Sequence, residues 1–99
     1  MDRELESLLE LSQQLNTYAE AGEWETVERL ERERRLRLQA WCEAHAAGMD
    51  PAQHRGLERL RELNHRLEAL TRANQERVGA ELQDLKRGRS GAAAYAANS

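Results

Sequence analysis

Leucines that recur every three or four residues constrain the fold of this 99-residue chain more than any other feature. This spacing places apolar side chains on one face of an α-helix. The chain has 15 leucines and 15 alanines, but only two valines, Val27 and Val78, and no isoleucine or phenylalanine. Strands favour β-branched and aromatic residues, so their scarcity argues against a β-sheet. The sequence therefore predicts an all-α protein.

Three segments carry the helical pattern, and short breaks separate them. The predicted helices cover about residues 2–20, 23–46 and 50–87. Gly22 suits the left-handed conformation that ends many helices. At the second break, Gly48 ends a helix, Asp50 is an N-cap residue and Pro51 occupies the first helical position. The short connections favour antiparallel neighbours, and hence a three-helix bundle over residues 1–87 or a helical hairpin with an extended arm.

The third predicted helix is much longer than the first. About 36 residues at 1.5 Å each reach roughly 54 Å, so its far end overhangs the bundle or finds a partner. From Gly88 the composition changes to GRSGAAAYAANS, and glycine weakens a helix. We therefore expect a short flexible or partly helical C-terminal tail over residues 88–99, with Tyr95 as its one large side chain.

Charge and hydropathy argue against nucleic-acid binding, membrane insertion and secretion. The 18 acidic and 15 basic residues leave a formal charge of -3, whereas nucleic-acid binders are usually basic. The one basic run, residues 29–37, contains two glutamates and no stacking aromatic. It is interpreted as a solvated face, with Glu31 and Arg35 paired at i,i+4 and Arg34 snorkelling along the apolar stripe. No run is long and apolar enough for membrane insertion, and the N-terminus lacks the layout of a secretory signal.

Side chains that could support catalysis or bind a metal are few. Cys42 and His45 lie three residues apart, but a metal site needs three or four ligands, and nucleophilic catalysis needs an oxyanion site and an orienting third group. His54 and His65 are interpreted as polar boundary residues. The glycines form no phosphate-binding loop. We expect no enzyme, metal or cofactor. A lone cysteine forms no intramolecular disulfide, so the expected location is the cytoplasm.

Three segments resemble a known family. They are AEAGEWETVERLERE at residues 19–33, LNHRLEAL at 63–70 and AAAYAANS at 92–99. Together with the order and lengths of the predicted helices, they are similar to the flagellar export chaperone FliT family. The resemblance implies a cytoplasmic chaperone that binds the filament-cap protein FliD through the disordered C-terminal region of FliD, prevents its premature assembly and delivers it to the type III export gate.

The resemblance also suggests where partners bind. FliD is expected in a groove between the second and third helices, because an uncovered leucine face there would accept an amphipathic helix. The candidate residues are Trp41, Leu60, Leu63, Leu67 and Leu70. The competing interpretation of each leucine is a place in the bundle core. Trp24 is assigned to the core, whereas Trp41 either packs there or stays partly exposed.

The tail carries the second expected partner site. Tyr95 matches the tail tyrosine with which family members dock on the export-gate protein FlhA, and the family also contacts the export ATPase FliI. Family members often continue into a fourth helix that covers the groove, whereas four residues follow Tyr95 here. A full fourth helix is therefore not expected.

The alternative from a different class is a structural coiled-coil protein. The leucine spacing is close to a heptad repeat, so the stripes could instead be consumed by self-association, for example in a homodimer. The tail would then have no role. The weakest alternative is a hydrolase or metal enzyme built on Cys42 and His45.

Overall fold

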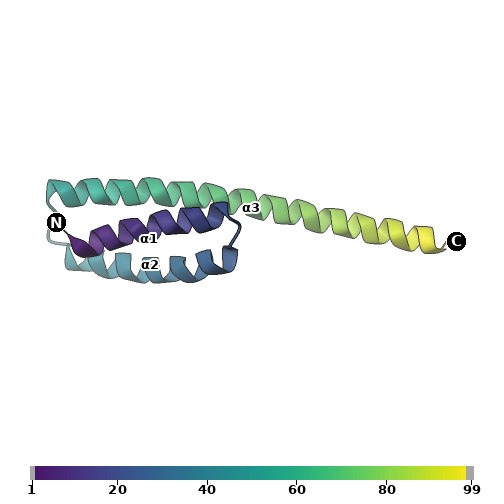
Figure 1. Ribbon diagram of the computed structural model, residues 1–99, viewed down its shortest axis with the longest axis horizontal. Helices are drawn as coiled ribbons and strands as arrows, with labels where there is room; N and C mark the ends of the chain where they lie inside the picture. The colour runs from purple at the N-terminus through teal and green to yellow at the C-terminus, as the bar shows by residue number, and fades with distance from the viewer. Residues whose placement is uncertain (1, 98–99) are drawn as a thin grey trace.

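The structure is a computed structural model that describes the backbone of residues 2–97 and the side chains of residues 2–87. It contains three α-helices. They are α1 (Arg3–Glu20), α2 (Trp24–Ala44) and α3 (Pro51–Ala97). Consecutive helices run antiparallel, and α1 packs against both α2 and α3 (Figure 1). The predicted all-α, antiparallel three-helix bundle is confirmed.

Local capping chemistry sets most of the helix ends. The carboxylate of Asp2 accepts a hydrogen bond of 3.1 Å from the backbone N–H of Leu5 and so caps α1. Gly22 follows the end of α1 with a φ of +76°, in the left-handed region. Asp50 caps α3 through a 2.7 Å bond from the N–H of Gln53, and the Gln53 side chain accepts from the N–H of Asp50 at 3.0 Å. The helix ends at both breaks lie within two residues of the expected ones.

The third helix is longer than predicted. Its backbone stays helical to Ala97, ten residues beyond the expected end at residue 87. The prediction ended the helix where glycine appears, since each glycine costs about 1 kcal/mol relative to alanine. Five alanines follow in residues 92–97 and have the highest helix propensity of any residue. We attribute the continuation to them. The separation of residues 88–99 as a tail stays a prediction.

The far part of α3 extends beyond α1 and α2, and the molecule is 72 Å long but only 21 by 18 Å across (Figure 1). We call residues 78–97 the overhang. Its described apolar side chains are exposed, with Val78 at 41%, Leu82 at 55% and Leu85 at 62%. The prediction that the far end of this helix overhangs the bundle is confirmed.

Two apolar clusters form the core around α1. The first contains Leu5, Leu8, Trp41 and Leu60, and the second contains Leu15, Ala19, Val27 and Leu67. Ser12 lies between these clusters along α1, and Asn16 next to it donates a 3.0 Å hydrogen bond to the backbone carbonyl of Leu63 on α3. Because α1 supplies residues to both clusters, it is the central helix of the bundle.

A small residue lets α1 approach α3 closely near the first cluster. A Cβ atom built at Gly56 would lie 2.6 Å from the Cδ2 atom of Leu5, which is too close for a real contact. Gly56 therefore makes room for the Leu5 side chain.

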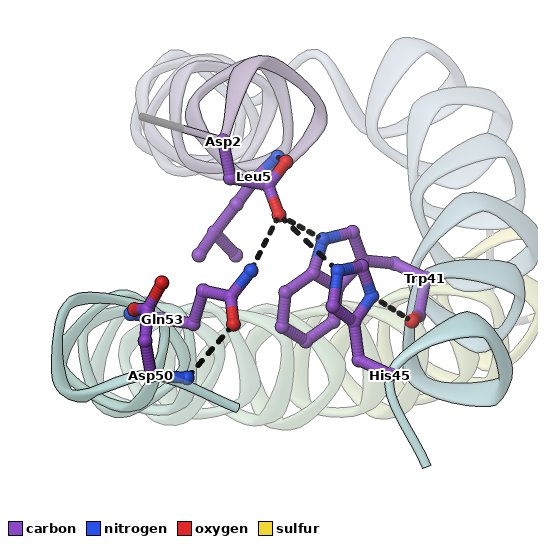
Figure 2. A network of polar contacts seen from close by, with 6 residues as sticks. All are labelled: Asp2, Leu5, Trp41, His45, Asp50 and Gln53. Atoms are coloured by element: carbon purple, nitrogen blue, oxygen red, sulfur yellow. Dashed lines mark hydrogen bonds and ion pairs between the residues drawn. The ribbon is translucent and has the colours of Figure 1, made fainter. Parts of the chain in front are cut away.

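Asp2 links the three helices at one end of the bundle (Figure 2). Its Oδ2 atom accepts a 2.7 Å hydrogen bond from the indole N–H of Trp41 on α2 and a 3.3 Å bond from the amide of Gln53 on α3. Just past α2, His45 Nε2 lies 3.7 Å from the same oxygen, and the imidazole stacks on Trp41 with ring centroids 4.0 Å apart. The hydrogen bond from Leu5 and then that from Trp41 are the main causes of the lowered pKa of Asp2.

Candidate functional site

A groove runs along the bundle between α2 and α3. Among residues 2–97, no Cα atom of α2 comes within 8 Å of a Cα atom of α3. The space between these helices contains a hollow of about 600 Å³ lined by both. A second hollow of about 270 Å³ shares Glu31, Asn64 and Glu68 with the first and continues to Gln75. We call the two hollows together the α2–α3 groove.

One end of the groove is apolar. Leu38 and Cys42 line it from α2, and Leu57 and Leu60 line it from α3. Leu60 is a member of the first core cluster, and Leu38 and Leu57 are partly buried against that cluster. Each pair is three or four residues apart, so each helix presents two successive turns. Cys42 is exposed, so its thiol is accessible from the solvent at this end of the groove.

The middle of the groove is charged, and its two glutamates interact with other residues of the groove lining. Arg35 and Glu31 form an ion pair at 2.9 Å, as predicted from their spacing. Glu68 accepts a 3.1 Å hydrogen bond from the side-chain amide of Asn64. Arg61 on α3 has no carboxylate within 4 Å among the side chains that the structure describes. The lining therefore offers more positive charge than its own acids neutralise.

Arg34 is the buried charge of the groove. Its side chain donates a 2.7 Å hydrogen bond to the Oδ1 atom of Asn64, and the residue is only 7% exposed. Its Nε atom has no hydrogen-bond partner, and no ion pair involves it among residues 2–87. Burial lowers the pKa of Arg34, and Glu31 only partly offsets this effect. The snorkelling predicted for Arg34 is wrong, because its guanidinium is held against Asn64 instead of extending into water.

Arg37, three residues along α2, shows the opposite arrangement and reaches toward α1. Its guanidinium donates to Glu4 at 2.9 Å and to Ser7 at 2.7 Å, both on α1. Glu33 lies 3.7 Å away as a further partner. The hydrogen bond to Glu4 is the main cause of the raised pKa of Arg37. The seam between α1 and α2 is thus electrostatically satisfied, whereas the groove between α2 and α3 is not.

The comparison with known families decides the identity of the chain. The family model for the flagellar protein FliT matches residues 2–97. The chain belongs to the FliT family. Neither the curated proteins nor the solved structures contain a match. FliT family membership confirms the resemblance found in the sequence and implies a flagellar export chaperone, which is a class of binding protein and not of enzyme.

The structure distributes the five FliT-type candidate residues between core and groove. Trp41, Leu60, Leu63 and Leu67 are each less than 5% exposed, and Leu70 is partly buried beside the second cluster. Leu60 lines the larger hollow of the groove and Leu67 the smaller one. Trp41 is held by Asp2, and the carbonyl of Leu63 faces Asn16 on α1. The side chain of Tyr95 lies outside the described residues, and its backbone belongs to the overhang.

Sequence reasoning missed Leu38, Leu57 and Arg34 as lining residues of a FliT-type groove. The two leucines lie on the stripes that the sequence predicts, so the helical spacing identifies them as apolar-face residues. What the spacing does not give is which side of each stripe α1 covers. Arg34 also lies on the apolar stripe of the second helix. A charged residue at such a position indicates that it makes a polar contact inside the bundle.

The cysteine and histidine side chains considered for metal binding or catalysis lie apart from one another. Within the described residues, no group of three or more His, Cys, Asp or Glu side chains could hold a metal ion. Cys42 lines the groove, whereas His45 Nδ1 lies 2.8 Å from the Trp41 carbonyl and belongs to the Asp2 network. His54 and His65 are exposed on α3. Residues 2–97 contain no helix that is both long and apolar enough to cross a membrane.

Proposed function

We propose that this FliT family member is a cytoplasmic chaperone that holds the C-terminal region of the filament-cap protein FliD in the α2–α3 groove. The observation that carries the proposal is the groove itself, in which an apolar end formed by Leu38, Leu57 and Leu60 stays open to a ligand. A helix whose apolar face packs into such a groove removes apolar surface of both partners from water.

The length of the groove suits a helical ligand. From Leu57 to Gln75 the lining of α3 spans 18 residue steps, which corresponds to about 27 Å of helix. A bound helix of about five turns would match this length. Its apolar residues would meet the leucines at one end, and its polar residues would meet Thr71, Arg72 and Gln75 at the other.

The candidate residues have different parts in this proposal. Leu60 and Leu67 are proposed to contact FliD directly, since they line the groove. Trp41, Leu63 and Leu70 are proposed to support the groove from within the bundle, because Trp41 and Leu70 belong to or pack against the core clusters and Leu63 is buried. A FliD segment bound in this way would be withheld from assembly until it is released at the export gate.

The overhang is proposed to dock on the export machinery. Tyr95 would bind the cytoplasmic domain of FlhA, and contact with the ATPase FliI belongs to the same proposal. Tyr95 lies 35 residue steps beyond Leu60 on one continuous helix, which is about 52 Å along its axis. The gate could therefore bind the overhang while FliD still occupies the groove.

A second candidate function rests on a separate observation. Val78, Leu82 and Leu85 form an exposed stripe at steps of four and three residues on the overhang. Such a stripe could pair with a second copy, and the protein would then act as a structural coiled coil. A homodimer formed only through the overhang would leave the groove free, so it is also compatible with the chaperone proposal.

Calorimetric titration with the C-terminal region of FliD from the same organism, together with light scattering, tests the chaperone proposal. We expect saturable binding with one FliD region per chain. A stable homo-oligomer that gives no heat on addition of FliD would reject the chaperone proposal and favour the structural coiled coil.

A further inference from the structure

The groove places a buried positive charge where a bound helix would lie. Arg34 lines the larger hollow together with Leu38 on α2 and Leu60 on α3, so its guanidinium adjoins the apolar end of the groove. A carboxylate accepts hydrogen bonds from guanidinium N–H groups in a planar, often bidentate geometry, and these bonds are stronger than those to a neutral amide. Among the described side chains, Arg34 donates to the neutral amide oxygen of Asn64, at 2.7 Å.

The acids of the groove do not satisfy Arg34. Glu31 is engaged by Arg35 at 2.9 Å, and Glu68 accepts the amide of Asn64 at 3.1 Å. The side-chain amide of Asn64 thus bridges Arg34 and Glu68: its oxygen accepts a hydrogen bond from Arg34, and its nitrogen donates one to Glu68. The Nε atom of Arg34 is buried without a hydrogen-bond partner in the described part of the chain. A buried donor without an acceptor costs free energy, so the contacts within the bundle leave the Arg34 guanidinium incompletely satisfied.

From these contacts we infer that the α2–α3 groove selects a helix with an aspartate or glutamate on its apolar face, whose carboxylate binds the Arg34 guanidinium. The inference rests on the proposed function, and the occupant is a segment of the FliD C-terminal region. Leucine-type side chains of that segment fill the space between Leu38, Leu57 and Leu60, and the acid lies about one turn away from them. Arg61, on the opposite side of the groove, adds a second positive charge near the same path.

Arg34 is thereby a specificity-determining residue. Apolar contact by itself would accept many amphipathic helices, whereas a helix that buries a neutral or basic residue against Arg34 leaves the guanidinium unneutralised. Arg34 lies in the groove and not on the overhang, so this selection of cargo is spatially separate from gate docking.

The test uses two designed amphipathic helical peptides of 18 residues that differ only at one central position of the leucine face, Glu in one and Gln in the other. Both are titrated calorimetrically into the wild-type protein, which needs no variant that could misfold. We expect the Glu peptide to bind about tenfold more tightly, as one charge-assisted hydrogen-bonded pair predicts. Equal affinity of the two peptides, or no binding of either, would overturn the inference.

Three variants then assign the preference to a residue. Arg34→Gln should abolish the difference between the peptides, and Arg34→Lys, which keeps the charge but loses the planar fork, should retain part of it. Arg37→Gln is the matched control on the same helix, and it should retain the full difference because Arg37 faces α1. A preference for Glu that persists in Arg34→Gln would contradict the inference. Circular dichroism of each variant verifies that the bundle is folded.

The same experiment separates this inference from the proposed function. If the Glu peptide binds and the FliD region does not, the acid-selective groove stands and the chaperone proposal fails. If the FliD region binds with the same affinity to wild type and to Arg34→Gln, the chaperone proposal stands and the role of Arg34 is refuted.

Discussion

Replacing Asp2 with alanine tests how the three helices are held together at one end. The substitution removes the N-cap of α1, which contributes about 1 kcal/mol in most proteins. It also removes the acceptor of the Trp41 indole N–H, and Trp41 is only 3% exposed. A buried donor left without a partner costs at least about 1 kcal/mol. We therefore expect Asp2→Ala to lower the free energy of unfolding by about 2 kcal/mol.

Asp50→Ala is the matched control, since Asp50 is also a helix N-cap. Its Oδ1 atom accepts the N–H of Gln53 at 2.7 Å, but no hydrogen bond joins its side chain to α1 or α2 in the described part of the chain. Its loss should cost about 1 kcal/mol, the contribution of a cap alone. For a domain of this size, thermal unfolding followed by circular dichroism should show Tm lowered by about 10 °C in Asp2→Ala and about 5 °C in Asp50→Ala.

The pH dependence gives a second test of the Asp2 network. The pKa of Asp2 is lowered in the folded state from its ordinary value of 3.8, mainly by the Leu5 N–H and then by Trp41. The carboxylate therefore stabilises the fold fully above pH 3.8, and this contribution is lost as the pH falls through the lowered folded pKa. Asp2→Asn keeps a cap acceptor but does not titrate, so it should remove this part of the acid destabilisation.

For the alanine variants, equal Tm values for Asp2→Ala and Asp50→Ala at pH 7 would refute the reasoning.

Three further predictions concern the core, the groove and the overhang. Leu8→Ala should lower the free energy of unfolding by about 3 kcal/mol in denaturant titration because Leu8 is fully buried, whereas Leu82→Ala, at an exposed site, should change it by less than about 0.5 kcal/mol. Leu38→Gln should weaken calorimetric FliD binding about tenfold with unchanged helicity, and full affinity would place FliD elsewhere. Tyr95→Ala should weaken FlhA binding about tenfold while FliD binding stays intact, and unchanged FlhA affinity would reject that assignment.

Local sequence chemistry predicts most of this fold. Gly22 and the Asp50-Pro51 pair act on their own neighbours, so the ends that they set are visible in the sequence and differ from the structure by at most two residues. The C-terminal end of α3 was not predicted, because it depends on the balance of two weak opposing propensities, glycine against a run of alanines. The two propensities differ by about 1 kcal/mol per residue, and the pattern of residue types alone does not show which of them prevails.

Contacts between distant residues explain why the site was only partly predictable. Leu60 and Leu63 lie on one predicted stripe and are both buried, yet Leu60 lines the groove, whereas the backbone carbonyl of Leu63 accepts a hydrogen bond from Asn16 on α1. Which members of the stripe line the groove depends on where α1 and α2 lie around α3, and the spacing of leucines does not specify this. The bond between Asp2 and Trp41 joins residues 39 positions apart, and it is this bond that fixes Trp41, whose place the sequence left open.

The length of α3 allows it to carry two proposed binding sites. Near its N-terminal end the helix forms one wall of the groove, and toward its C-terminal end Val78, Leu82 and Leu85 are left exposed by the residues that the structure describes. A single continuous helix, Pro51–Ala97, thus connects the proposed cargo site to the proposed gate-binding site. Shortening the overhang should therefore impair gate docking and leave cargo binding unchanged.

The occupancy of the α2–α3 groove is the most direct test of the central claim, and Cys42 reports it. This single, exposed cysteine lines the apolar end, so its rate of modification by a thiol reagent measures access to the groove. At tenfold excess over the dissociation constant, the FliD C-terminal region should slow modification of Cys42 about tenfold. The double variant Cys42→Ser, Gln14→Cys, with its thiol on the exposed face of α1, should react at an unchanged rate. Unchanged reactivity of Cys42 under saturating FliD would contradict the account.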